Sequence, residues 1–165
     1  MKRISAAFAL FALIVTGACV GKASPAQDER GHPVFQLGSN KIEVDYGRPT
    51  LRGRNPEELI QPGQVWRMGA NGPTTLTTQA SLRFGEKVIP AGKYTLQAKL
   101  VEREKWHLLI ESEDSSVTAE VPFTLQRINP AVESLTIALE KKDKGVRLSV
   151  QWGRLALMTE FQAAN

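Results

Sequence analysis

The chain has 165 residues, of which 42% are hydrophobic and 23% are charged, and this length predicts one domain with enough chain to bury a core. The formal net charge is +4 at pH 7, and it falls to +2 without the basic start, Lys2 and Arg3, because 19 basic residues then face 17 acidic ones. A net charge this close to zero is not typical of nucleic-acid-binding domains, which carry an excess of basic residues. We therefore expect no nucleic-acid partner.

The first residues have the pattern of a secretory signal peptide. Lys2 and Arg3 precede an apolar run at Ala6–Val15, and small residues follow at 16–18. The apolar run is too short to span a bilayer comfortably, which favours a cleaved signal over a transmembrane helix. We therefore expect residues 1–18 to be a signal peptide and the protein to be exported.

The next residue, Cys19, is the single cysteine of the chain. The run Val15–Cys19 resembles the bacterial lipobox, in which the cysteine after the cleavage site carries a lipid, although Thr16 stands where that motif usually has leucine. An exported chain with one cysteine forms no internal disulfide, and lipidation would account for the lone thiol. The alternative is ordinary cleavage near Ala18 or Ala23, which leaves the thiol free.

A lipid on Cys19 would make the membrane a partner of this protein. Val20 and Gly21 follow the cysteine, so no aspartate occupies the position that retains enteric lipoproteins in the inner membrane. By that analogy we expect the periplasmic face of the outer membrane, or the periplasm or secretion if the chain is not lipidated. The polar residues 19–32 are expected to be a flexible tether to a domain at 33–162.

Short segments of that domain alternate apolar and polar residues with the period of a β-strand. The clearest is Lys93–Leu100, and Pro122 predicts an edge or a bend within its own segment. We expect about nine strands, from segments at Pro33–Leu37, Lys41–Tyr46, Thr74–Thr78, Leu82–Ile89 (a hairpin), Lys93–Leu100, Trp106–Glu111, Val117–Leu125, Ser134–Glu140, Val146–Trp152 and Leu155–Phe161.

Evidence for helices is slight. Pro56–Ile60, with Asn55 as a cap, and Asn129–Glu133 each predict a single helical turn. The chain is therefore predicted to be all-β, a single antiparallel β-sandwich or jelly-roll-like domain with one long ordered loop.

That loop, Tyr46–Asn71, concentrates arginines and aromatic residues in a segment with little periodicity. A connector this long is usually functional or disordered, and its apolar side chains argue for order. Guanidinium groups match carboxylates and phosphates, so the loop is a candidate cradle for a small anionic or glycan ligand. The candidate ligand-binding residues are Tyr46, Arg48, Arg52, Arg54, Trp66, Arg67 and Asn71.

An alternative role for the arginines is to bind backbone carbonyls and hold the loop as an internal plug, and the tryptophans are more simply packing residues. A binding module should expose at least two of the four arginines in a concavity. A plug should bury them in backbone hydrogen bonds.

Catalytic signals are weak. The chain has no Gly-x-Ser-x-Gly elbow, no His-Glu-x-x-His motif and no clustered Cys/His spacing, so we assign no catalytic residue, no metal site and no cofactor. A hydrolase that uses His107 or the pair Glu57 and Glu58 remains a lesser alternative. The neighbouring arginines would oppose the raised carboxyl pKa that acid catalysis needs.

Two runs in the loop carry a family resemblance. Tyr46–Arg54 reads Tyr-Gly-Arg-Pro-Thr-Leu-Arg-Gly-Arg, and Val65–Asn71 reads Val-Trp-Arg-Met-Gly-Ala-Asn. With the hairpin Pro90–Leu96 and the strand Leu148–Gly153, they resemble the DUF2911 family of exported bacterial β-rich domains, over about Ile42 to Phe161. The resemblance implies the fold and export but no reaction.

The sequence departs from the family pattern at three places. These are Asn55–Glu58, Pro62 with Gly63, and Gly72–Thr74, where the family usually has Glu-Ala-Thr. We therefore expect an exported cell-envelope β domain whose arginine loop contacts a glycan, a small anion or an envelope protein. The alternative is a purely structural envelope protein.

Overall fold

The computed structural model describes residues 29–164. The expected signal peptide, Cys19 and most of the tether lie outside the described residues. The described part is all-β, as predicted, with one antiparallel sheet and one short helix. Its elements are β1 (Arg30–Gly31), β2 (Val34–Leu37), β3 (Asn40–Gly47), α1 (Pro56–Leu59), β4 (Val65–Trp66), β5 (Thr74–Thr78), β6 (Leu82–Phe84), β7 (Lys87–Ile89), β8 (Gly92–Glu102), β9 (Lys105–Glu111), β10 (Val117–Lys142) and β11 (Gly145–Ala163).

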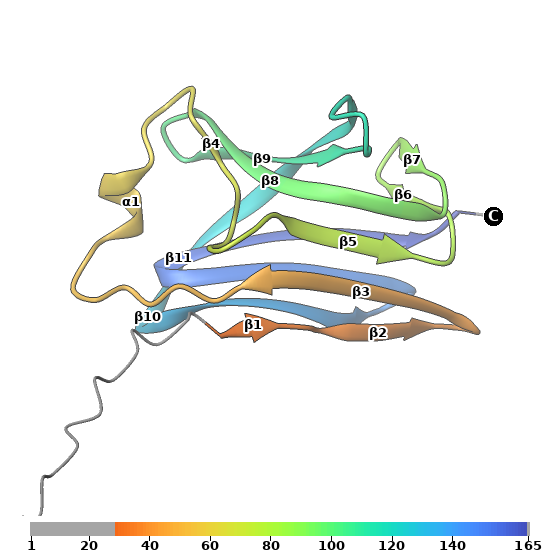
Figure 1. Ribbon diagram of the computed structural model, residues 1–165, viewed down its shortest axis with the longest axis horizontal. Helices are drawn as coiled ribbons and strands as arrows, with labels where there is room; N and C mark the ends of the chain where they lie inside the picture. The colour runs from red at the N-terminus through yellow and green to blue at the C-terminus, as the bar shows by residue number, and fades with distance from the viewer. Residues whose placement is uncertain (1–28, 165) are drawn as a thin grey trace, which may run out of the picture.

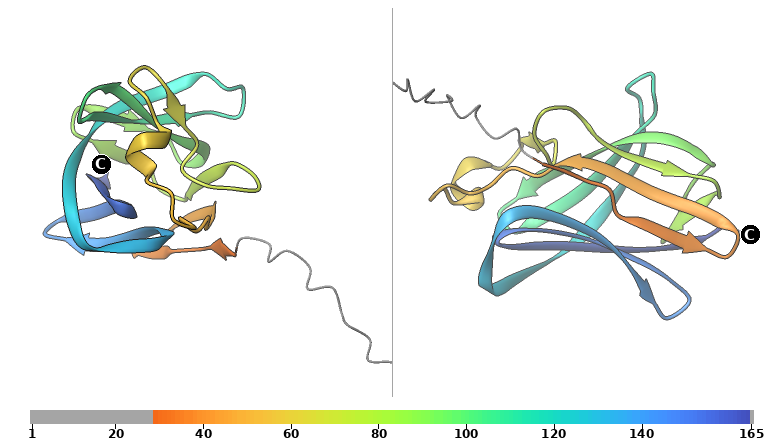
Figure 2. Two further views of the ribbon diagram at one scale, coloured as in Figure 1. Left: turned by 90° about the vertical axis from the view of Figure 1, so that its left-hand side faces the viewer. Right: turned by 60° about the horizontal axis from the view of Figure 1, so that its bottom comes forward.

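The sheet runs in the order β1-β3-β5-β8-β9-β10-β11-β6-β7, while β2 pairs with β3 and β4 pairs with β8. It curls over, so that the β8–β9 region lies across the interior from the hairpin end of β10 and β11 (Figure 1, Figure 2). The long loop with α1 occupies one end of the molecule, and the β6–β7 hairpin occupies the other (Figure 1).

The two longest strands differ from the sequence prediction. We expected four separate strands and a helical turn at Asn129–Glu133, but this part of the chain stays extended within β10, and the turn prediction was wrong. The register of the β10–β11 pair shifts on either side of Val132, which lies opposite Gly153. Gly153 has a φ of 61°, a conformation that glycine adopts without strain, and both strands bend here.

Pro122 lies in the first part of β10, which pairs with β9 through Phe123, whereas pairing with β11 begins at Thr124. Proline lacks a backbone donor and is tolerated where a strand has a neighbour on one side only. The predicted edge position of Pro122 is confirmed.

The short strands β1 and β4 were not predicted, whereas the helix was. Arg30 and Gly31 form β1 beside Tyr46 and Gly47, in the segment expected as tether. Gly31 permits this approach, because a Cβ there would lie 2.4 Å from the Tyr46 ring. The turn at Pro56 is confirmed as α1, capped by the Asn55 side chain, which accepts a hydrogen bond from the Glu57 backbone N–H at 3.2 Å.

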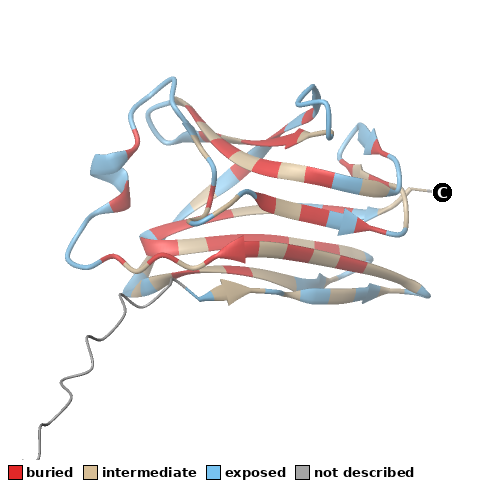
Figure 3. Cartoon of the chain, in the orientation of Figure 1, coloured by how far each residue is buried: buried red, intermediate tan, exposed pale blue. Residues whose placement is uncertain are grey.

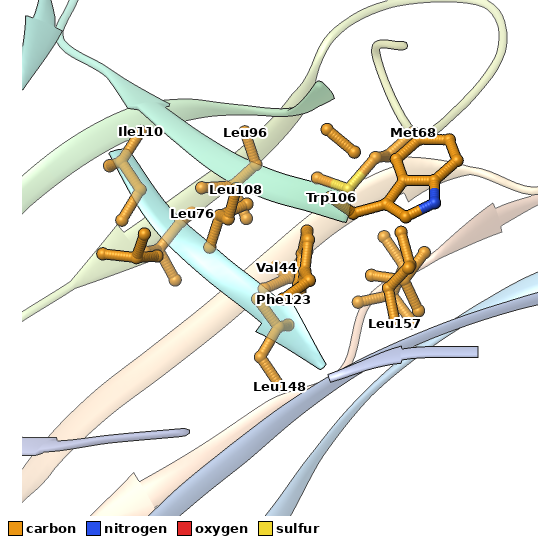
Figure 4. Packing of buried hydrophobic residues seen from close by; sticks show 14 of the residues in the cluster. Val44, Met68, Leu76, Leu96, Trp106, Leu108, Ile110, Phe123, Leu148 and Leu157 are labelled. Atoms are coloured by element: carbon orange, nitrogen blue, oxygen red, sulfur yellow. The ribbon is translucent and has the colours of Figure 1, made fainter. Parts of the chain in front are cut away.

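The core lies between the two halves of the curled sheet. Buried and less buried residues alternate along the strands (Figure 3), as the period of two predicts. Figure 4 shows the inward residues of several strands meeting, with Met68 of the long loop beside Trp106. Met68 is completely buried, so the loop contributes to the core. Between residues 29 and 164, no helix has the length and apolarity needed to cross a membrane.

The turn between β9 and β10 is closed by a local cluster of polar groups. The hydroxyls of Ser112 and Ser116 donate to the Asp114 carboxylate at 2.6 and 2.7 Å. These hydrogen bonds lower the pKa of Asp114 to about 2. The donors and acceptor satisfy one another within the turn, which makes the cluster a structural feature of the hairpin.

Candidate functional site

The first half of the long loop joins the end of β3 to the middle of β10. Leu135 N–H donates to the Pro49 carbonyl and Leu51 N–H donates to the Glu133 carbonyl, each at 2.9 Å. Thr50 and Ser134 lie opposite each other in an antiparallel bridge. We call residues 46–54 the closing segment, because these contacts close the curled sheet between elements more than eighty residues apart in sequence.

Tyr46 anchors this closure from inside the core. Its side chain is 3% exposed, and its hydroxyl accepts a hydrogen bond from the Ile137 N–H at 2.9 Å and lies 3.4 Å from the Ile137 carbonyl. As a candidate ligand-binding residue, Tyr46 would present this hydroxyl to a ligand. It instead satisfies a buried backbone group of β10.

The three arginines of the closing segment bind polar groups of the same region. Arg48 Nε donates to the Leu135 carbonyl at 3.3 Å. Arg54 donates from Nε to the Leu51 carbonyl and from Nη2 to the Thr50 carbonyl, both at 3.0 Å. Arg52 donates from Nε to the Thr50 hydroxyl at 3.2 Å. Arg48 and Arg54 thus make the backbone bonds expected of a plug, although Arg52 and Arg54 remain exposed.

The second run of the loop, Val65–Asn71, which we call the second motif, lies against the end of β3. The Thr74 hydroxyl donates to the Met68 carbonyl at 2.9 Å, and the Ala70 backbone lies directly against Gly47. Arg67 and Asn71 remain exposed on this segment. Within the described residues the Arg67 side chain makes no hydrogen bond or ion pair, so its guanidinium is available to a ligand or a partner.

The tryptophans at this end of the molecule form one cluster. Trp66 stacks on Trp152 with ring centroids 5.7 Å apart and an interplanar angle of 12°, and it meets Trp106 edge-on at 6.4 Å. Aromatic pairs in these geometries attract one another beyond the area they bury. Trp66 is half-buried and Trp152 is 5% exposed, and the buried Nε1 of Trp152 has no hydrogen-bond partner among the described residues. Trp66 is therefore a packing residue, whatever else it contacts.

A pocket of about 270 Å³ lies between α1, the β8–β9 hairpin and β10; we call it the α1 pocket. Its apolar lining comes from Ile60, Leu100 and Trp106, and its polar lining is chiefly charged. The residues of the pocket are Glu57, Ile60, Gln61, Pro62, Leu100, Arg103, Glu104, Trp106 and Arg127.

The charges of the α1 pocket are partly paired. Arg127 Nη2 lies 2.8 Å from Glu57 Oε1 and 3.3 Å from Glu104 Oε1. Arg103 is exposed and has no hydrogen bond or ion pair within the part of the chain that the structure describes. One guanidinium is thus held between two carboxylates, and a second is available.

Sequence reasoning did not find Arg103, Glu104 or Arg127. The first two belong to the short charged turn between β8 and β9, and none of the three lies in a motif. The pairing of β9 with β10 brings the β8–β9 turn toward Arg127, and Arg127 also binds Glu57 of α1. These contacts join residues that are distant in sequence, so no local pattern predicts them. None of the seven residues predicted to bind a ligand lines the α1 pocket, and their role in binding stays a prediction.

His107 lies away from the α1 pocket, on β9. Its Nδ1 is 2.6 Å from the Glu120 carboxylate of the neighbouring strand β10. Glu57 does line the pocket, but its Oε1 lies against Arg127. Among residues 29–164 no three His, Cys, Asp or Glu side chains are grouped as a metal site would require.

Tyr46→Phe tests the closing segment. The substitution removes the hydroxyl and leaves the buried Ile137 N–H without this acceptor, which should lower the free energy of unfolding by about 1–3 kcal/mol. Urea denaturation of the full chain measures the change. Tyr94→Phe is a matched control, since the Tyr94 hydroxyl donates to the Pro90 carbonyl at 2.9 Å within its own hairpin. A loss no larger than that of the control would contradict the closing role.

Comparison with known proteins yields a family but no individual relative: no curated protein and no solved structure matches the chain. The family model described as "Protein of unknown function (DUF2911)" matches residues 29–161, which include the closing segment, the second motif and every strand except the last two residues of β11. Because the match covers most of the sequence, the chain belongs to the DUF2911 family.

Proposed function

We propose that this protein is an exported cell-envelope binding module whose α1 pocket takes a sugar that carries an anionic group. The observation that carries the proposal is the α1 pocket itself. Its lining combines Arg103, which pairs with no described residue, the Arg127–carboxylate cluster and apolar side chains. In this view the closing segment holds the fold together, and α1 of the same loop forms one wall of the site.

The chemistry of the pocket suits such a sugar. Carboxylates accept hydrogen bonds from sugar hydroxyls, and the guanidinium fork of Arg103 matches a carboxylate or a phosphate. Arg127 holds Glu57 and Glu104 in place before a ligand arrives. A volume of about 270 Å³ is close to the lower end of small-molecule pockets, roughly 300 Å³, and fits one or two sugar rings.

Export and attachment complete the proposal. The signal pattern at residues 1–18 and the lipobox-like run ending at Cys19 support a lipid-anchored protein on the periplasmic face of the outer membrane. There the ligand would be an envelope glycan. Arg67 and Asn71, exposed on the second motif, would be the first surface to examine for an envelope protein partner.

The second candidate is a structural envelope protein without a ligand. The bonds of Arg48 and Arg54 to backbone carbonyls favour it, because they give these arginines a complete role inside the fold. Both proposals assign the closing segment the same task. They differ in whether the α1 pocket binds anything.

The test is a thermal-shift titration of the full chain with N-acetylmuramic acid, glucuronic acid and neutral glucose. A ligand at one hundred times its Kd should add about 2.7 kcal/mol of stability. We expect a shift with an acidic sugar, none with glucose, and at least about tenfold weaker binding in Arg103→Ala, which loses a charge-assisted hydrogen bond.

Arg154→Ala is the matched control, because Arg154 is also exposed and makes no hydrogen bond or ion pair within the described part of the chain, and it lies outside the α1 pocket. It should bind like the unaltered protein. The proposal fails if no sugar shifts the melting temperature, or if both variants weaken binding equally. A protein partner or a structural role would then take its place.

A further inference from the structure

We propose a second site that binds a phosphate monoester, in a pocket at the opposite end of the molecule from α1. This pocket, the turn pocket, has a volume of about 380 Å³ and lies between the β10–β11 turn, β6 and the end of β11. Figure 1 shows the β6–β7 hairpin and the end of β11 at the side of the molecule farthest from α1. The proposal is independent of the function proposed for the α1 pocket.

The fold brings three separate segments to this pocket. β11 doubles back beyond Gly153, so that its first residue, Gly145, lies against the carbonyl of Phe161 near its other end. A Cβ at position 145 would be 2.4 Å from that carbonyl oxygen, so only glycine permits the approach. On the other side, Arg83 of β6 pairs in register with Gln162. The walls are therefore fixed by backbone contacts.

Two cations of the turn pocket pair with none of the described residues. Its acidic residues are engaged, since Glu160 Oε1 lies 2.9 Å from Arg147 Nη2, and Asp143 lies 3.6 Å from Lys142 Nζ. Arg83 and Lys144 also line the pocket and make no hydrogen bond or ion pair with any described residue. An arginine and a lysine that bind no other described residue thus line one concavity.

This arrangement matches a phosphate monoester on a small carbon body. The guanidinium of Arg83 offers two parallel donors to phosphate oxygens, and the ammonium of Lys144 supplies a compact second charge. Phe161 also lines the pocket, and its ring is held in the core beside Phe84, with ring centroids 4.9 Å apart. The carbon stems of Arg83 and Lys144 offer apolar surface to the carbon atoms of the ligand. Asp143 is the opposing charge, 83% exposed on the turn, and it should weaken binding without preventing it.

The experiment follows the backbone amides of Gly85 and Gly145, both in the pocket lining, by NMR as glycerol 3-phosphate is added to the full chain. We expect both amides to shift with a saturable curve. In the double variant Arg83→Gln with Lys144→Gln, affinity should fall by about tenfold or more, because two charge-assisted contacts are lost. Asp143→Asn should bind glycerol 3-phosphate more tightly, because it removes the opposing charge. Asparagine also tolerates the φ of 44° at this turn, so the backbone should keep its conformation.

The matched control is Arg154→Gln with Lys99→Gln, which removes the same charge from residues outside the turn pocket that have no ion pair within the described chain. It should bind as the unaltered protein does. Equal weakening in both double variants, or no shift of Gly85 and Gly145 at saturating glycerol 3-phosphate, overturns the proposal.

A second arm identifies the source of the phosphate group. Vesicles of phosphatidylcholine with phosphatidic acid, which presents a phosphate monoester, are compared with vesicles of phosphatidylcholine alone. Binding to the first only, and its loss in Arg83→Gln with Lys144→Gln, would assign the site to a lipid headgroup. Binding of glycerol 3-phosphate without vesicle binding would assign it to a soluble phosphate ester. Vesicle binding that the double variant retains would count against the site.

Discussion

Gly47→Ala is expected to lower the free energy of unfolding by about 3 kcal/mol or more, the upper part of the range for an overpacked site. A Cβ at position 47 would lie 1.9 Å from the Ala70 carbonyl oxygen and 2.7 Å from its carbonyl carbon. Both atoms are backbone, so no side chain can turn away. The loop cannot retreat either, because Met68, two residues earlier, is fully buried in the core. Urea denaturation of the full chain measures the loss.

Gly53→Ala is the matched control for this prediction. Gly53 lies in the closing segment at a φ of +76°, with no atom within 4 Å of an added Cβ. Alanine there meets only the left-handed backbone penalty, about 1–2 kcal/mol. If Gly47→Ala costs no more than Gly53→Ala, the second motif is not seated on β3 as the structure describes.

The parts of the fold that depend on near neighbours in sequence were predictable, and the parts that depend on distant contacts, such as the one between Ala70 and Gly47, were not. The strand at Thr74–Thr78 was predicted with its bounds, and α1 was predicted from Asn55 and Pro56, because β propensity and capping act between near neighbours. The bend of β10 and β11 was missed. It depends on Gly153 facing Val132 across the hairpin, a relation between residues that are distant in sequence.

The candidate site divides in the same way. Two motifs single out the loop in the sequence, and in the structure its first half bonds to β10 and α1 lines a pocket. The partners of its arginines could not be read from the sequence: Arg48 binds a carbonyl 87 residues away. Arg103 and Arg127 belong to segments without a motif, yet both line the α1 pocket and Arg127 binds Glu57 of α1. The motifs identify the long loop from local sequence, but contacts between residues distant in sequence determine what its side chains bind.

Trp66→Ala is expected to destabilise the protein by about 3 kcal/mol, the lower end for a truncated core tryptophan, because Trp66 is only half-buried. The substitution removes the ring that stacks on Trp152 and meets Trp106, so both lose an aromatic neighbour together. Loss of this ring also opens the cluster to water. Denaturation followed by the fluorescence of the two remaining tryptophans reports the stability and the environment in one measurement.

Two neighbouring substitutions make the result specific. Val65→Ala changes the preceding residue of β4, which is 48% exposed, and should alter stability by no more than about 0.5 kcal/mol. Trp66→Phe keeps an aromatic ring against Trp152 and should recover part of the loss. A tryptophan that served as an exposed ligand platform would behave otherwise, since its truncation would weaken ligand binding with little effect on unfolding. If Trp66→Ala lowers the free energy of unfolding by less than about 1 kcal/mol, the packing role is contradicted, and Trp66 is again a candidate ligand-binding residue.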